Sequence, residues 1–210
     1  MTESESEDCQ QRGAVLACVA AISSAKALGS EANLAAAREL ASRAASGPPA
    51  LRRGVTRVYA HNLGGERVTY CAGALSGFLD DEDDQVRRFA ADAFRHTSSP
   101  RSSDLRRFIE VFAASRALRA GSRTFSEYLL EFGPEDPEWA LSVLQAVLDN
   151  AHDEESYSFA GDNLVRLVLR LYTDQTADQD LRIRAMDVFD DLMGRYTNEA
   201  QSALDEWDRR

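Results

Sequence analysis

Apolar residues recur along this chain with the three-to-four-residue spacing of amphipathic helices, in successive segments separated by short breaks. The breaks are rich in glycine, proline, serine and aspartate, as at Gly47-Pro48-Pro49 and Gly133-Pro134. No useful stretch alternates with the period of two that is typical of a strand. The pattern therefore predicts an all-α fold, with helices at 9–28, 31–46, 50–63, 67–79, 84–97, 103–118, 123–132, 136–150, 160–173, 178–194 and 197–208.

One helical pattern is repeated. The segment Leu51–His61 aligns with Val86–His96 at an offset of 35 residues, and Leu181–Phe189 carries a similar pattern. Each copy begins with an aliphatic residue followed by arginine, and eight positions later an aromatic residue falls on the same helical face: Tyr59, Phe94 and Phe189. Because a helix pair cannot bury its apolar face alone, this periodicity predicts helix pairs stacked on one another.

The second copy resembles a known repeat family. Asp83–Phe94 is similar to the second helix of a HEAT repeat, with an Asp-rich turn, Val-Arg and then Ala-rich positions, and Asp180–Phe189 is the next best match. The resemblance covers roughly residues 31–194. It implies a right-handed superhelical stack of HEAT-like helix pairs, an α-α superhelix, and implies nothing about function. We expect residues 1–8 to be a disordered acidic lead and residues 9–210 to form a single helical-repeat domain.

A weaker resemblance concerns the C-terminal part. Leu167–Tyr172, Leu181–Asp190 and Ala203–Trp207 resemble helical-repeat tails of large bacterial ATP-dependent proteins, some of them in phage defence. This resemblance implies a stand-alone repeat protein, a truncated relative or one piece of a split system, such as a helical regulatory subunit of a bacterial defence ATPase. The chain itself lacks the phosphate-binding loop, because its only lysine, Lys26, has no glycine-rich sequence before it.

Composition narrows the class of protein further. The chain has 35 acidic and 24 basic residues, a net charge of −11, which argues against a broad surface for nucleic acid or anionic membranes. The spacing of Cys9, Cys18 and Cys71 matches neither a zinc site nor a disulfide framework, so we expect a reducing cytoplasm. The apolar run Ala14–Ile22 is too short to span a bilayer, and no membrane association is predicted.

Two clusters have the residue types of a metal site. His61 and His96, with Cys71 nearby in sequence, are candidate ligands, but both histidines occupy one repeat register at a helix C-terminus, where partial positive charge is favourable. The acidic run Asp80–Asp84 lacks the glycine and glutamate that close an EF-hand loop, so we expect it to cap the helix at 84–97. The sequence predicts no metal, no cofactor and no enzyme activity.

Arginines recur at the start of the repeated helices and would form a ladder along one edge of a stack: Arg52, Arg53, Arg87, Arg88, Arg182 and Arg184. Such a ladder fits a phosphate backbone, as in HEAT-like DNA glycosylases, or it pairs with carboxylates of neighbouring repeats. Pairing is the more economical interpretation, because acidic loops precede two of the three copies.

Aromatic residues gather around Gly133–Pro137, and two of them, Tyr128 and Trp139, are candidate anchors for a partner. The alternative is that they fill an irregular joint between helices. Together these observations predict a non-enzymatic scaffold or adaptor that binds another, unidentified protein. A HEAT-like nucleic-acid-binding or DNA-processing protein remains the alternative from another class.

Overall fold

The computed structural model describes residues 31–64, 68–150, 161–174, 177–195 and 197–207, and positions 9, 12, 13, 15 and 16. Within these residues every regular element is a helix, which confirms the all-α prediction. The α-helices are α3 Glu31–Ala45, α4 Pro49–His61, α5 Val68–Ser76, α6 Asp84–Ala91, α7 Ser103–Ala113, α8 Ala117–Phe132, α9 Pro137–Asn150, α10 Gly161–Thr173, α11 Gln179–Arg195 and α12 Thr197–Trp207. Two 3-10 helices are η1 Asp92–Arg95 and η2 Gly133–Glu135. The expected lead, 1–8, and most of the expected helix 9–28 lie outside the described residues.

Local chemistry explains where several helices begin and end. Helix α4 starts with Pro49 in its first turn, where proline costs no hydrogen bond. Helix α11 is preceded by Asp178, whose carboxylate accepts a hydrogen bond from the backbone N–H of Leu181 at 2.8 Å. At the other end of α4, the Asn62 side-chain amide donates to the carbonyl of Val58 at 2.8 Å. These signals are short-range, and the boundaries predicted near them lie close to the observed ones.

The prediction for residues 103–132 was wrong. We expected helices at 103–118 and 123–132 with a break near Gly121, but α7 ends at Ala113 and α8 starts at Ala117. Gly121 lies inside α8 as a kink, with φ −128° and ψ 15°. The observed break is supported from α9, because the Asn150 amide donates to the carbonyls of Ala113 and Ser115 at 3.1 and 2.9 Å. The predicted helix 84–97 is likewise divided, into α6 and η1.

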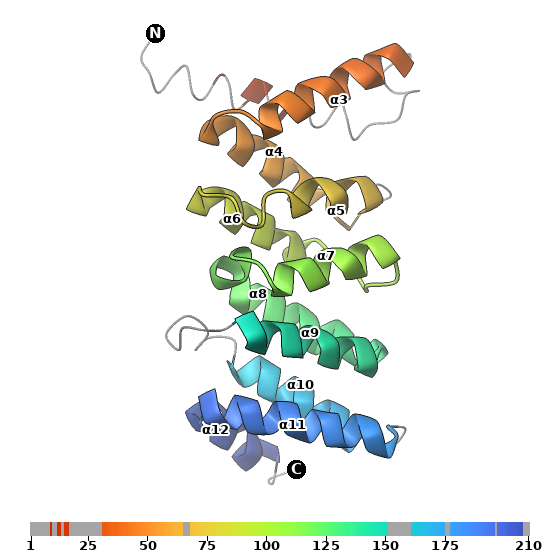
Figure 1. Cartoon of the computed structure of the whole chain (residues 1–210), viewed down its shortest axis with the longest axis vertical. Helices are drawn as coiled ribbons and strands as arrows, with labels where there is room; N and C mark the ends of the chain where they lie inside the picture. The colour runs from red at the N-terminus through yellow and green to blue at the C-terminus, as the bar shows by residue number, and fades with distance from the viewer. Residues whose placement is uncertain are drawn as a thin grey trace. The chain divides into compact units, whose positions relative to one another are not determined.

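The chain divides into two compact units, Met1–Phe108 and Ile109–Arg210, with the division inside α7. In the first unit α4 is central and packs against α3, α5 and α6 (Figure 1). Small buried residues allow these helices to approach closely, and Ala41 and Ala44 of α3, Ala60 of α4 and Ala90 of α6 are all buried.

In the second unit α10 is central and packs against α8, α9, α11 and α12 (Figure 1). It is apolar over much of its circumference, as expected for a helix with neighbours on several sides. Its buried residues are Gly161, Leu164, Val165, Leu167, Val168, Leu169 and Leu171. No helix in the described part of the chain is both long and apolar enough to serve as a bilayer-spanning segment.

Candidate functional site

The acidic loop between α5 and α6 is built around the cap of a helix. Asp83 is the N-cap residue of α6, and its Oδ1 accepts hydrogen bonds from the backbone N–H groups of Gln85 and Val86 at 2.9 and 3.1 Å. Asp81 in turn accepts a hydrogen bond from the backbone N–H of Asp83 at 2.8 Å. The predicted capping role of this loop is confirmed.

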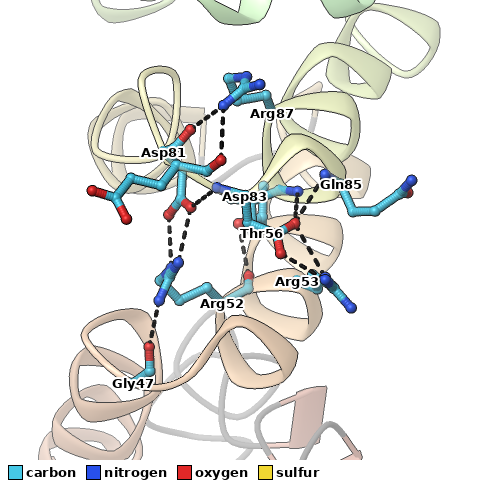
Figure 2. Close-up of polar contacts among 10 residues, drawn as sticks. Gly47, Arg52, Arg53, Thr56, Asp81, Asp83, Gln85 and Arg87 are labelled. Atoms are coloured by element: carbon cyan, nitrogen blue, oxygen red, sulfur yellow. Dashed lines mark hydrogen bonds and ion pairs between the residues drawn. The ribbon is translucent and has the colours of Figure 1, made fainter.

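Two arginines of α4 reach this loop (Figure 2). Arg52 forms a bidentate pair with Asp81, with Nε–Oδ2 and Nη2–Oδ1 distances of 2.7 and 3.0 Å, and also donates to the carbonyl of Gly47 at 2.7 Å. Arg53 pairs with both carboxylate oxygens of Asp83, at 3.2 and 2.6 Å. The loop between α5 and α6 is therefore tied to α4 by two charge-assisted pairs.

These contacts shift the pKa values of Asp83 and Arg52. The hydrogen bond from Arg53 lowers the pKa of Asp83, and the backbone N–H groups of Val86 and Gln85 act in the same direction, against the opposing effect of burial. The hydrogen bond with Asp81 raises the pKa of Arg52 above its ordinary value, although burial acts against it. The contacts of Asp83 therefore favour its ionised carboxylate, and the pair with Asp81 favours the protonated guanidinium of Arg52.

The other two ladder arginines of the first unit contact this loop or the first residue of α6. Arg87 donates to the backbone carbonyl of Asp81 (Figure 2). It also pairs with the Asp84 carboxylate at 2.7 Å. Arg88 also approaches Asp84, at 3.2 Å, but both side chains of this pair are exposed to solvent. Arg87 is thus mostly enclosed by its contacts, whereas Arg88 forms a surface pair.

In the second unit, Arg182 donates to the carbonyl of Asp174 at 3.0 Å, and its Nε is buried with no hydrogen-bond partner in the described residues. Arg184 pairs with Glu138. Each of the six arginines therefore has a carboxylate or carbonyl partner within its own unit.

The two aromatic candidates are in the core. Tyr128 and Trp139 are 3% and 7% exposed, and the Trp139 indole N–H donates to Glu110 at 3.1 Å. The Tyr128 ring lies 5.0 Å from that of Phe132, centroid to centroid. This burial favours the interpretation in which the aromatic residues fill a joint between helices, because an anchor needs exposed area to meet a partner.

A pocket of about 500 Å³ lies in the first unit, beside the end of α4 and beside η1. Its polar and aromatic lining consists of Arg57, His61, Asn62, Phe89, Asp92, Arg95 and His96. The rings of His61 and His96 meet edge to face with centroids 4.5 Å apart, and both side chains are exposed. Sequence reasoning placed these histidines in one repeat register, but we predicted neither the contact between their rings nor the pocket.

Gly64 makes this close approach possible. A Cβ atom at Gly64 would lie 2.1 Å from the carbonyl oxygen of His96, far inside contact distance, and nearby atoms are backbone. The chain after α4 can therefore lie directly against the residue that follows η1 only because residue 64 has no side chain. This contact helps to hold the two histidines beside each other.

Within the described residues, no group of three or more His, Cys, Asp or Glu side chains is arranged to hold a metal ion. Cys71 is buried, and His61 is exposed. Comparisons of the chain with protein-family models, with curated proteins and with solved structures found no match.

Proposed function

We propose that this protein is a non-enzymatic interaction scaffold, built as a right-handed superhelical stack of HEAT-like helix pairs that binds another protein in the cytoplasm. The repeated helix pattern and the all-helical structure support this proposal, because stacked helix pairs present extended surfaces and need no reaction centre.

The observation that carries the proposal is that the ladder arginines already contact carboxylates or carbonyls of the protein itself. A nucleic-acid-binding ladder would present guanidinium groups free to neutralise phosphates. Arg52 and Arg53 are instead committed to Asp81 and Asp83, and Arg87 to the same loop. Arg52, Arg53 and Arg184 thus connect separate elements, and the other three ladder arginines contact groups close to them in sequence, which supports a structural role for the ladder.

A titration with duplex DNA tests the alternative function. At about 150 mM salt, where the Debye length is about 8 Å, we expect little affinity, since loose charge attraction is screened. Replacing Arg87 and Arg88 with Gln should reduce stability more than it changes DNA affinity, with the larger effect from Arg87→Gln. Submicromolar DNA binding that these substitutions abolish without lowering the melting temperature would overturn the scaffold proposal.

Direct support would come from a partner. The full chain, tagged and purified from its native host, should retain a second protein in a fixed ratio, and the two purified proteins should re-form the complex. Failure to reconstitute any captured protein would count against the proposal, because a scaffold needs a specific partner.

A further inference from the structure

We propose that the pocket beside the end of α4 binds an acidic peptide segment of a partner protein. In this arrangement Arg57, Arg95 and the two histidines hold carboxylate groups, and the apolar part of the pocket contacts a neighbouring aliphatic side chain. The inference deepens the proposed function and rests on it.

The pocket offers positive charge that is not committed elsewhere. The Arg57 guanidinium lies 5.7 Å from the centroid of the Phe89 ring, and it has no carboxylate partner among the described residues. Arg95 lies 3.5 Å from Asp92, and the two side chains are 64% and 46% exposed. An exposed pair of this kind contributes little, so a ligand carboxylate can compete for Arg95.

This state differs from that of the neighbouring arginines. Arg52, on the same helix as Arg57, is held by Asp81 in a bidentate pair, and the Asp81 side chain is only 8% exposed. A ligand would have to break that pair to reach Arg52. In a chain with a net charge of −11, the pocket is therefore a local surface where an acidic segment meets available cations.

The histidines supply further donors in fixed positions. A neutral imidazole carries one N–H donor, and His61 and His96 both line the pocket with their rings in contact. Because Gly64 lies directly against the His96 backbone, the backbone segments that carry the two rings are close together before a ligand arrives. Such preorganisation reduces the entropy that binding would otherwise cost.

The size and lining of the pocket favour a peptide over a small inorganic anion. A volume of about 500 Å³ accommodates several side chains, and Val58, Ala60 and Phe89 give it an apolar wall. A segment in which glutamates flank a leucine matches this combination of cationic and apolar groups. A single phosphate would leave the apolar wall unused.

The test uses the full chain and a fluorescein-labelled peptide, Glu-Leu-Glu-Glu-Leu-Glu, with binding followed by anisotropy at low ionic strength. We expect saturable binding that the double substitution R57Q/R95Q weakens by about tenfold or more, because both charge-assisted contacts are lost. The matched control is R43Q/R123Q, which makes the same change in charge at two exposed arginines paired with glutamates four residues away. This control should change affinity by about twofold or less, since loose surface charges contribute little.

Histidine ring NMR signals provide a second measurement. The chain has three histidines, and the peptide should shift the signals of His61 and His96 while leaving that of His152 unchanged. Circular dichroism and the melting temperature establish that each variant is folded.

Several results would overturn the inference. Equal loss of affinity in the two double variants would indicate non-specific attraction, and a requirement for a divalent metal would indicate a metal site. Inorganic phosphate that displaces the peptide and shifts the same histidine signals equally would indicate a small-anion site. If R57Q/R95Q loses no affinity for the peptide, the pocket is not the peptide-binding site, even if the chain still re-forms a complex with its captured partner. Failure of that reconstitution would instead count against the scaffold.

Discussion

At the scale of single residues, the carboxylate of Asp83 has two structural roles. It caps α6 through the N–H groups of Gln85 and Val86, and it pairs with Arg53 of α4. Removing the carboxylate by D83A should lower the free energy of unfolding by about 2 kcal/mol, mostly through the lost cap. The substitution D83N keeps an oxygen that can cap the helix but removes the charge, so we expect a loss of less than about 1 kcal/mol. Denaturant unfolding measures both, and equal losses would contradict the dual role.

The same pair predicts how stability depends on pH. Because the folded-state pKa of Asp83 is lowered, chiefly by Arg53, its ionisation stabilises the fold above the unfolded-state pKa. That contribution is lost as the pH falls through the folded-state pKa. The stability difference between the wild type and D83N should therefore be constant above about pH 5 and narrow below about pH 4. A difference that stays constant down to pH 3 would show that the charge of Asp83 contributes nothing.

At the scale of helices, the break between α7 and α8 depends on a distant side chain. Asn150, at the end of α9, donates to the carbonyls of Ala113 and Ser115. Replacing it with Ala leaves these carbonyls without that donor and should lower the free energy of unfolding by about 1–2 kcal/mol. The control is Q145A on the same helix, since the amide of Gln145 bonds to Asp149 at an exposed site. Urea unfolding of the two variants should separate them, and equal stabilities would contradict this account of the break.

The limits of sequence reasoning follow from these contacts. The starts of α4 and α11 were predictable because their signals, Pro49 and Asp178, lie within the adjacent turn. The break after Ala113 was not, because its donor is 37 residues away and Gly121 is a stronger local signal. The acidic run before α6 did predict partners for the arginines of the first two copies. In the third copy, however, the side chains of Arg182 and Arg184 contact Asp174 and Glu138 and not the adjacent acidic loop. The pocket could not be predicted, since it needs the close approach at Gly64 as well as the register of the two histidines.

At the scale of the whole molecule, the dominant quantity is the net charge of −11. Excess charge of one sign destabilises a compact state by self-repulsion, and salt screens that repulsion. Salt also weakens exposed ion pairs, such as Arg43–Glu39 and Arg123–Glu127, but such pairs contribute little. The inner pairs of Arg52 and Arg53 are partly buried and are screened less.

The screening of repulsion should therefore outweigh the weakening of surface ion pairs, and added sodium chloride should stabilise the protein. We expect the melting temperature to rise between about 10 mM and 150 mM salt, over which the Debye length falls from about 30 to 8 Å. Asp190 and Asp191 are exposed on α11, and replacing both with Asn changes the net charge from −11 to −9. That variant should melt higher than the wild type at low salt, and the difference should shrink as salt is added.

The R43Q/R123Q variant, with a net charge of −13, should show a larger salt dependence than the wild type, because it adds repulsion and removes two surface pairs. Parallel salt curves for all three proteins would contradict this account, and would mean that specific pairs, rather than net charge, set the electrostatic stability of the chain.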